Sequence, residues 1–209
     1  MALTAAPTTR RTQAERRAET RGRLLDATLE CLAELGYAGT TTTEVVQRAG
    51  LSRGAQVHHF PTKADLVVAA VEHLFQRRHD EFRQAFAKMP PGERSVDAAL
   101  DLMWEMFQGP TFDAWIELVV AGRTDPELKA EVIRVTEHFD EGTGQIFAEL
   151  FPEAVPAELR PIVLGFAIHV LNGAAVSRMA GIADTANESI ELLKLLSHLP
   201  FPIPGGHEE

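Results

Sequence analysis

The sequence is poor in the features that build disulfides, membrane spans and export signals. It contains one cysteine, Cys31, so no disulfide can form within the chain; on the apolar side of a helix, this cysteine is expected to be a buried structural thiol. No run of about 18 apolar residues occurs, which predicts no transmembrane helix, and the N-terminal residues lack the apolar stretch of a signal peptide. These absences favour a cytoplasmic protein with no membrane partner.

The motifs of enzymes and metal sites are missing as well. The chain has no phosphate-binding glycine loop, no HExxH and no paired cysteines, and no set of nucleophile, base and orienting group can be recognised. His58 and His59 are adjacent, so on a helix they point about 100° apart and do not converge on one ion. We therefore expect a protein that is not an enzyme, with no catalytic residue, no cofactor and no metal.

What the sequence does contain is helical periodicity. Its 209 residues, 45% of them hydrophobic, can bury the core of one or two domains. Leu25, Leu29, Leu32 and Leu35 recur at spacings of three and four, and no useful period-2 alternation appears, so we expect an all-α protein. After this first helix, further helices are expected at about residues 42–49, 53–60, 63–89, 94–108, 111–121, 126–150, 157–180 and 185–199, the last capped by Thr185 with Glu188 and ended by Pro200.

Residues 41–63 carry the most informative pattern. Thr41, or equally Thr42, can cap a short helix, and Gly50 can take the left-handed conformation that ends it. Ser52 can then cap a second short helix. Two short helices around a turn that contains glycine form a helix-turn-helix, whose second helix can enter the major groove of DNA.

The segment around this motif resembles the DNA-binding domain of the TetR/AcrR family of bacterial transcriptional regulators. The residues that carry the resemblance, within about residues 20–70, are Ala27, Leu35-Gly36-Tyr37, Thr42-Thr43, Ala49-Gly50-Leu51-Ser52, Gly54, His58-His59-Phe60, Lys63 and Leu66. One departure is Gln56-Val57, where family members usually have an apolar residue and then a tyrosine that contacts a phosphate. The resemblance implies about nine helices, with a three-helix DNA-binding domain over residues 1–62 and a helical ligand-binding and dimerisation domain over residues 63–209.

Ten residues are expected to face double-stranded DNA. They are Thr42, Thr43, Arg53, Gly54, Ala55, Gln56, Val57, His58, His59 and Lys63. Arg53 can hydrogen-bond bidentately to guanine, and Gln56 can read adenine if it points outward. The threonines and Lys63 stand at helix starts, where phosphates bind readily. Of the two histidines, one is expected to contact a phosphate and the other to pack near Phe60.

The charge distribution agrees with DNA binding although the net charge is −10. Residues 1–60 carry a balance of +2, whereas the remainder carries −12. Local positive charge attracts phosphates, and an acidic remainder limits unspecific binding. The first 23 residues hold six arginines: Arg10, Arg11, Arg16, Arg17, Arg21 and Arg23. They predict an arm that touches the DNA backbone; the alternative is a solvated helix face.

The later helices combine aromatic and polar residues in a way that suits an effector pocket. Candidate effector-binding residues are Met103, Trp104, Phe107, Trp115, Arg123, His138, Phe139, Phe166, His169 and Asn172. Ligand sites are mostly apolar with a few placed polar groups. The alternative for each aromatic residue is plain core packing. An aromatic or acyl-like effector is expected from apolarity alone.

The last two expected helices are the candidates for a dimer interface. Residues 165–181 are apolar around most of the helix circumference, which marks a helix buried on several sides. The proposed interface residues are Gly173, Ala174, Val176, Ile190, Leu193 and Leu196. Two such helices from each subunit form a four-helix bundle, the mode of dimerisation that the resemblance implies. The alternative is that these helices close a monomeric core.

Together these observations predict a transcriptional regulator that responds to a ligand. We expect a homodimeric repressor that binds a palindromic operator and is released by a small apolar or aromatic effector. Two alternatives from other classes remain at this point: a helical protein–protein adaptor that has lost DNA binding, and a small all-α enzyme.

Overall fold

The structure is a computed structural model that describes residues 12–199. Over these residues the chain forms nine α-helices, one short 3-10 turn and no strand, which confirms the all-α prediction. The elements are α1 (Gln13–Gly39), α2 (Thr42–Arg48), α3 (Arg53–His59), α4 (Lys63–Lys88), η1 (Pro91–Glu93), α5 (Val96–Met106), α6 (Pro110–Gly122), α7 (Pro126–Leu150), α8 (Arg160–Met179) and α9 (Ala183–Ser197).

Short-range side-chain chemistry sets the starts of the first helices. The hydroxyls of Thr41 and Ser52 accept hydrogen bonds from backbone amides three residues on, 3.1 Å and 3.3 Å away. Thr62 and Asp65 form a full capping box at the start of α4. Gly50 has φ 61°, the left-handed conformation expected after α2. The helix-turn-helix therefore has the boundaries that its capping residues predict.

The last two helices begin elsewhere than predicted. α9 begins at Ala183, and no side chain caps it, so the proposed cap by Thr185 and Glu188 is wrong. The reason is Gly181, whose φ of 85° reverses the chain directly after α8 and lets α9 start two residues later. α8 begins at Arg160 instead of about residue 157. Pro200 and the tail after it lie outside the described residues.

A break near the end of α1 was not predicted. Gly36 has φ 67° and ψ 177°, a conformation that is not helical and is accessible essentially to glycine alone. The Gly36 carbonyl then accepts hydrogen bonds from the Thr40 amide and hydroxyl, at 3.1 Å and 2.8 Å. Leu35, expected on the apolar face of the helix, is 45% exposed at this break.

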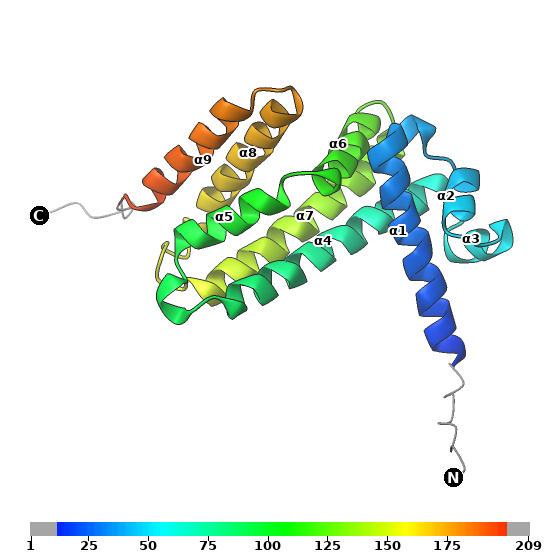
Figure 1. Cartoon of the computed structure of the whole chain (residues 1–209), viewed down its shortest axis with the longest axis horizontal. Coiled ribbons are helices and arrows are strands. Elements are labelled where there is room, and N and C mark those ends of the chain that lie inside the picture. Colours follow the sequence, from blue (N-terminus) through cyan, green and yellow to red (C-terminus); the bar gives the residue numbers. More distant parts are fainter. Residues whose placement is uncertain (1–11, 200–209) are drawn as a thin grey trace, which may run out of the picture.

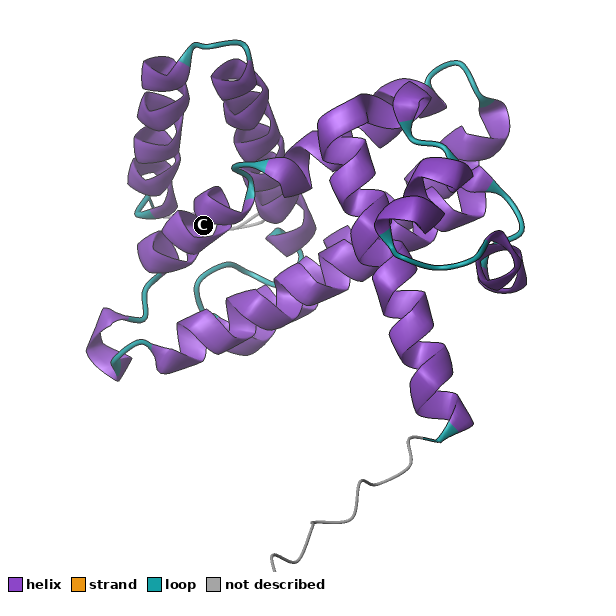
Figure 2. Ribbon diagram, turned by 45° about the vertical axis from the view of Figure 1, so that its right-hand side comes forward, coloured by secondary structure: helices purple, strands orange, loops and turns teal. Residues whose placement is uncertain are grey.

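The helices are arranged along two long members, α4 and α7, that run side by side (Figure 1). α1 crosses one end of this pair and packs against α4 and α6, with α2 and α3 beside it. α8 and α9 form a hairpin at the far side of the molecule from α2 and α3, and α5 connects it to the long pair (Figure 2). α4 therefore reaches from the helix-turn-helix into the second half of the chain.

Of the buried clusters that hold the described elements together, three involve the helices that matter for function. One lies beneath the helix-turn-helix and contains Leu24, Val45 and Phe60; it also contains Cys31, which is fully buried as predicted. A second lies where α1, α4, α6 and α7 meet. The third joins α5 and α6 to the α8–α9 hairpin. By length and composition α8 could cross a membrane, but here it packs along α9 and contributes Leu171 to the core.

Candidate nucleic-acid interface and ligand cavity

α3 presents one solvent-exposed face built from predicted DNA-binding residues. Arg53, Gly54 and His58 are exposed, and half of the Val57 side chain is accessible. These residues sit one turn apart on a seven-residue helix, so they share a side. Small side chains beside Arg53 let the helix backbone approach a groove closely, as base reading by the arginine requires.

Gln56 lies on the opposite side of α3, and the prediction that it reads a base is wrong. Its side chain is 1% exposed, and its amide donates a hydrogen bond to the backbone carbonyl of Phe60. The buried amide thus closes the last turn of α3, whose carbonyls would otherwise lack partners.

The two adjacent histidines have different surroundings. His58 is exposed, whereas His59 is half-buried beside Phe60, with 6.2 Å between ring centroids. Burial lowers the pKa of His59, and the neighbouring charges of Arg17, His58 and Arg21 lower it further. His59 is therefore the neutral, packing member of the pair, and His58 is the one free to contact a phosphate.

Lys63 does not extend into solvent. Its ammonium donates a hydrogen bond to the backbone carbonyl of Tyr37 and lies 4.0 Å from the centroid of the Tyr37 ring. Partial burial there lowers the lysine pKa. Lys63 therefore joins the start of α4 to the end of α1, and its predicted phosphate contact stays a prediction.

The arginine-rich segment has two different roles along its length. Arg23 donates hydrogen bonds to the Ala49 and Gly50 carbonyls, at 2.6 Å and 3.4 Å, and so fixes the turn between α2 and α3. Arg21 lies over the Phe60 ring, with 5.4 Å from the guanidinium carbon to the centroid. Arg16 and Arg17 are exposed on the first turns of α1. Arg10 and Arg11 lie outside the described residues.

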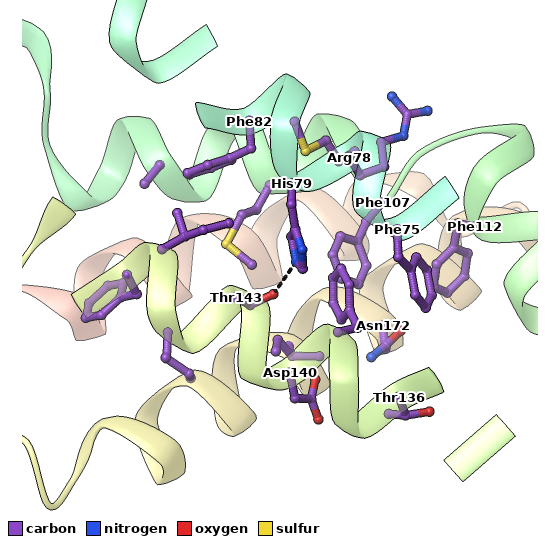
Figure 3. Close-up of a pocket in the computed structure, with 18 of the residues that line it drawn as sticks. Phe75, Arg78, His79, Phe82, Phe107, Phe112, Thr136, Asp140, Thr143 and Asn172 are labelled. Atoms are coloured by element: carbon purple, nitrogen blue, oxygen red, sulfur yellow. Dashed lines mark hydrogen bonds between the residues drawn. The ribbon is translucent and has the colours of Figure 1, made fainter. Parts of the chain in front are cut away.

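The second half of the chain encloses a cavity of about 110 Å³. It lies between α4 and α7, with α5, α6 and α8 completing the walls (Figure 3). Aromatic rings dominate the lining: Phe75 packs on Phe139 at 4.5 Å and on Trp115 at 5.2 Å between ring centroids. The full lining is Phe75, Arg78, His79, Phe82, Ala99, Met103, Met106, Phe107, Phe112, Trp115, Thr136, Phe139, Asp140, Thr143, Ile146, Phe147, Phe151, Leu164, Ile168 and Asn172.

A few polar groups interrupt this apolar wall. His79 Nε2 and Thr143 Oγ1 are 3.0 Å apart, and the imidazole stacks on Phe139 with ring centroids 4.9 Å apart (Figure 3). Burial lowers the pKa of His79, which favours the neutral imidazole. Asp140 stands at the rim with its pKa raised by partial desolvation. Asn172 enters from α8. Such a site suits a small, largely apolar ligand that has a polar group for orientation.

Five of the ten predicted effector residues line this cavity: Met103, Phe107, Trp115, Phe139 and Asn172. The other five do not, and their assignment to the cavity is wrong. Trp104 is buried instead against α8 and α9. The remaining four are exposed: Arg123, His138, Phe166 and His169. Arg123 follows the end of α6, and the other three lie on helix faces that do not line the cavity.

Sequence reasoning missed the contribution of α4 to the cavity. Phe75 and His79 lie there one turn apart, and Thr143 meets His79 from α7. A signal existed in the sequence, because Arg78, which lines the cavity, stands at spacings of four between the apolar residues Leu74 and Phe82. A polar arginine inside such a stripe marks a face that is not uniform core.

The six predicted dimer residues divide between the inside and the outside of the subunit. Ala174, Ile190 and Leu193 are buried within the chain, so their assignment to an interface is wrong. Gly173, Val176 and Leu196 are accessible. They are among the exposed residues of the two helices that are apolar or glycine, named here together the α8–α9 face: Ile162, Phe166, Gly173, Val176, Leu192, Leu195, Leu196 and Leu199. An exposed apolar surface of this kind marks an interaction site.

The fold and the exposed face of α3 define a helix-turn-helix DNA-binding protein with a second, cavity-bearing helical region. The protein-family model for "Bacterial regulatory proteins, tetR family" matches residues 24–70. An HTH-type transcriptional regulator of Mycobacterium bovis is 34% identical over 173 residues, which cover 80% of this chain and 87% of that protein. The chain therefore belongs to the TetR family of bacterial transcriptional regulators.

Other relatives agree with this membership. The regulator CymR of Pseudomonas putida is 42% identical over 128 residues; the match covers 61% of this chain and 63% of CymR, slightly less than two thirds of its length. The repressor AcnR of Corynebacterium efficiens is 26% identical over 184 residues, and the match covers 81% of this chain and 92% of AcnR. A Rhodococcus TetR-family crystal structure shares the fold with a TM-score of 0.71 at 17% identity, covering 86% of this chain and 99% of that one. Family membership makes the chain a DNA-binding transcriptional regulator and not an enzyme.

Proposed function

We propose that this regulator is a homodimeric cytoplasmic repressor whose operator is palindromic and whose effector is a small apolar or aromatic molecule. In this proposal residues 1–62 bind DNA, and residues 63–209 bind the effector and hold the dimer together. Arg53, Gly54, Val57 and His58 on α3 face the bases and the phosphates beside them. Repression is the activity that the name of the relative AcnR states.

One observation carries the proposal: a single helix connects the two regions. α4 begins at Lys63, four residues after the end of α3, and brings Phe75 and His79 into the cavity wall. A ligand that displaces this wall also moves the end of α4 next to α3. An inducer acts when it binds the displaced conformation more tightly than the conformation that binds DNA.

The size of the cavity supports this mechanism. At about 110 Å³ it is smaller than the pockets of drug-sized ligands, which measure roughly 300–1,000 Å³. A cavity of about 150 Å³ accommodates benzene. An effector of the size of a single ring or larger, enclosed in this cavity, would push the walls apart, and those walls include α4 and α6.

The α8–α9 face supports the homodimer. Leu192, Leu195 and Leu199 follow one another at spacings of three and four along α9, and each is more than half exposed. A second copy of the hairpin would cover them in a four-helix bundle. A two-fold dimer in turn fits an operator with two half-sites separated by about one DNA turn or a multiple of it.

Selection of bound DNA from a random pool by the purified protein tests the proposal. The expected result is an inverted repeat, bound by a dimer, at roughly physiological salt. Recovery of no motif by folded, dimeric protein would contradict operator recognition and favour a protein–protein adaptor. The selected operator also supplies the probe for an effector screen, in which an active compound must reduce operator binding.

A further inference from the structure

A carboxylate on α6, one of the helices that line the cavity, holds the end of α1. Glu117 on α6 accepts a hydrogen bond from the backbone amide of Tyr37, with 2.8 Å between Oε2 and the nitrogen. The bond joins residues 80 positions apart in the sequence. Tyr37 follows the break in α1 at Gly36, so the bond is made at the point where α1 loses its helical geometry.

The break provides the space that the carboxylate needs. A Cβ atom on residue 36 would lie 2.8 Å from Glu117 Oε2, closer than Cβ atoms approach other groups. Gly36 also holds a backbone conformation that other residues avoid. Two independent features, the left-handed φ and the missing side chain, therefore open this position to Glu117.

Tyr37 is held from its other side by the start of α4. Its carbonyl oxygen accepts the hydrogen bond from Lys63, whose ammonium also lies over the tyrosine ring. Lys63 is the first residue of α4 and follows α3 closely. Tyr37 thus connects α6, through Glu117, with the segment that leads out of α3, the recognition helix, into α4.

α6 lines the cavity and also carries the Glu117 contact. Phe112 and Trp115 line the cavity, and Glu117 follows Trp115 by two residues. Leu118, next to Glu117, is fully buried where α6 packs with α1 and α4. A displacement of Trp115 along or about the α6 axis consequently moves the carboxylate that holds Tyr37.

We infer that Glu117 is a positioning residue for DNA recognition: through the Tyr37 backbone it sets the orientation of α1–α3 relative to the cavity wall α6. The inference rests on the proposed operator binding and goes further by naming the contact through which α6 acts. Glu117 itself lies on α6, outside the exposed face of α3, so it acts on DNA recognition indirectly, through its contact with Tyr37.

Tyr37 offers a direct readout because it is the only tyrosine in the chain. Protein labelled with 3-fluorotyrosine gives one fluorine signal, which reports the surroundings of the Tyr37 ring, including the Lys63 ammonium over it. Three variants are compared with the wild type: Glu117→Ala, which removes the acceptor, Glu117→Gln, which keeps an acceptor oxygen, and Val120→Ala, an exposed position on the same helix. Each is titrated with the selected operator, and fluorescence anisotropy gives its affinity.

The expected result is a loss of operator affinity of roughly three- to thirtyfold for Glu117→Ala, together with a shifted fluorine signal. Glu117→Gln should retain most of the affinity and the wild-type signal, and Val120→Ala should match the wild type. Circular dichroism must show the same helix content throughout, and binding to random-sequence DNA should not change. This last control separates orientation from a general loss of folding.

Two results overturn the inference, and they are distinguishable from failure of the proposed function. If Glu117→Ala binds the operator within about twofold of the wild type, the contact does not position the recognition helix. If Glu117→Gln is as weak as Glu117→Ala, the hydrogen bond to Tyr37 is not the cause. A wild-type protein that binds no operator would instead overturn the proposed function, and with it this inference.

Discussion

Replacing Gly36 by alanine should destabilise the protein, although alanine is normally the better helix residue. The backbone at φ 67° and ψ 177° costs a residue with a Cβ about 1–3 kcal/mol. The new methyl group would also displace the Glu117 carboxylate and weaken its bond to Tyr37, which adds about 1 kcal/mol. The expected loss is at least about 2 kcal/mol, which lowers Tm by about 4–8 °C in a chain of this length.

The matched control lies on the same helix. At Gly22 an added Cβ meets no atom within 4 Å, and the backbone there is helical. Gly22→Ala should therefore raise stability by about 0.5–1 kcal/mol, because it removes the conformational freedom of glycine. Thermal unfolding followed by circular dichroism, at one protein concentration, measures both variants. Equal Tm values for Gly36→Ala and wild type, or a rise like that of Gly22→Ala, would refute the reasoning.

Three further predictions address the interface with DNA, the dimer and the cavity. Arg53→Ala should weaken operator binding by about 1–3 kcal/mol and leave the affinity for random DNA nearly unchanged, and equal losses on both DNAs would contradict base reading by Arg53. Gln56→Leu should select the same DNA sequence as the wild type. Leu195→Glu should convert the dimer to a helical monomer in size-exclusion chromatography, whereas Ile133→Glu, at an exposed position on α7, should not. A dimer that is unchanged by Leu195→Glu would exclude the α8–α9 face as the dimer interface. Burial holds the pKa of His79 below its ordinary value of about 6.5. The unfolded chain therefore binds a proton at His79 more readily than the folded chain, and the free energy of unfolding falls as the pH drops through 6.5 towards the pKa of the folded state. His79→Gln should make urea midpoints at pH 7.5 and 5.5 more alike, and an unchanged difference would contradict this.

Helix positions could be predicted because caps act within three residues. The hydroxyls of Ser52 and Thr62 accept hydrogen bonds from backbone amides three residues later, so these helix starts do not depend on distant parts of the chain. The start of α9 was missed because it depends on Gly181, whose left-handed conformation serves the packing of a hairpin. The break at Gly36 was missed for the same reason: its partner, Glu117, lies far away in the sequence.

The direction in which a side chain points was harder to predict than its helix. Gln56 was given an outward role because its amide suits adenine, yet it points into the protein and bonds to Phe60. Half of the effector candidates failed similarly: Trp104 and Phe166 are aromatic residues on the expected helices, but on faces turned away from the cavity. Periodicity identifies an apolar face, whereas the packing partners of that face follow from the fold as a whole.

The few large chromophores of this chain are distributed so that each reports on a different region. Of the two tryptophans, Trp115 stands in the cavity wall against Phe75, while Trp104 packs against the α8–α9 hairpin. Intrinsic fluorescence therefore contains one signal from the cavity wall and one from the cluster beside the α8–α9 hairpin, and Trp104→Phe would leave the signal of Trp115 alone. Quenching of that signal in unlabelled protein can then follow the occupation of the cavity by any compound, whether or not DNA is bound.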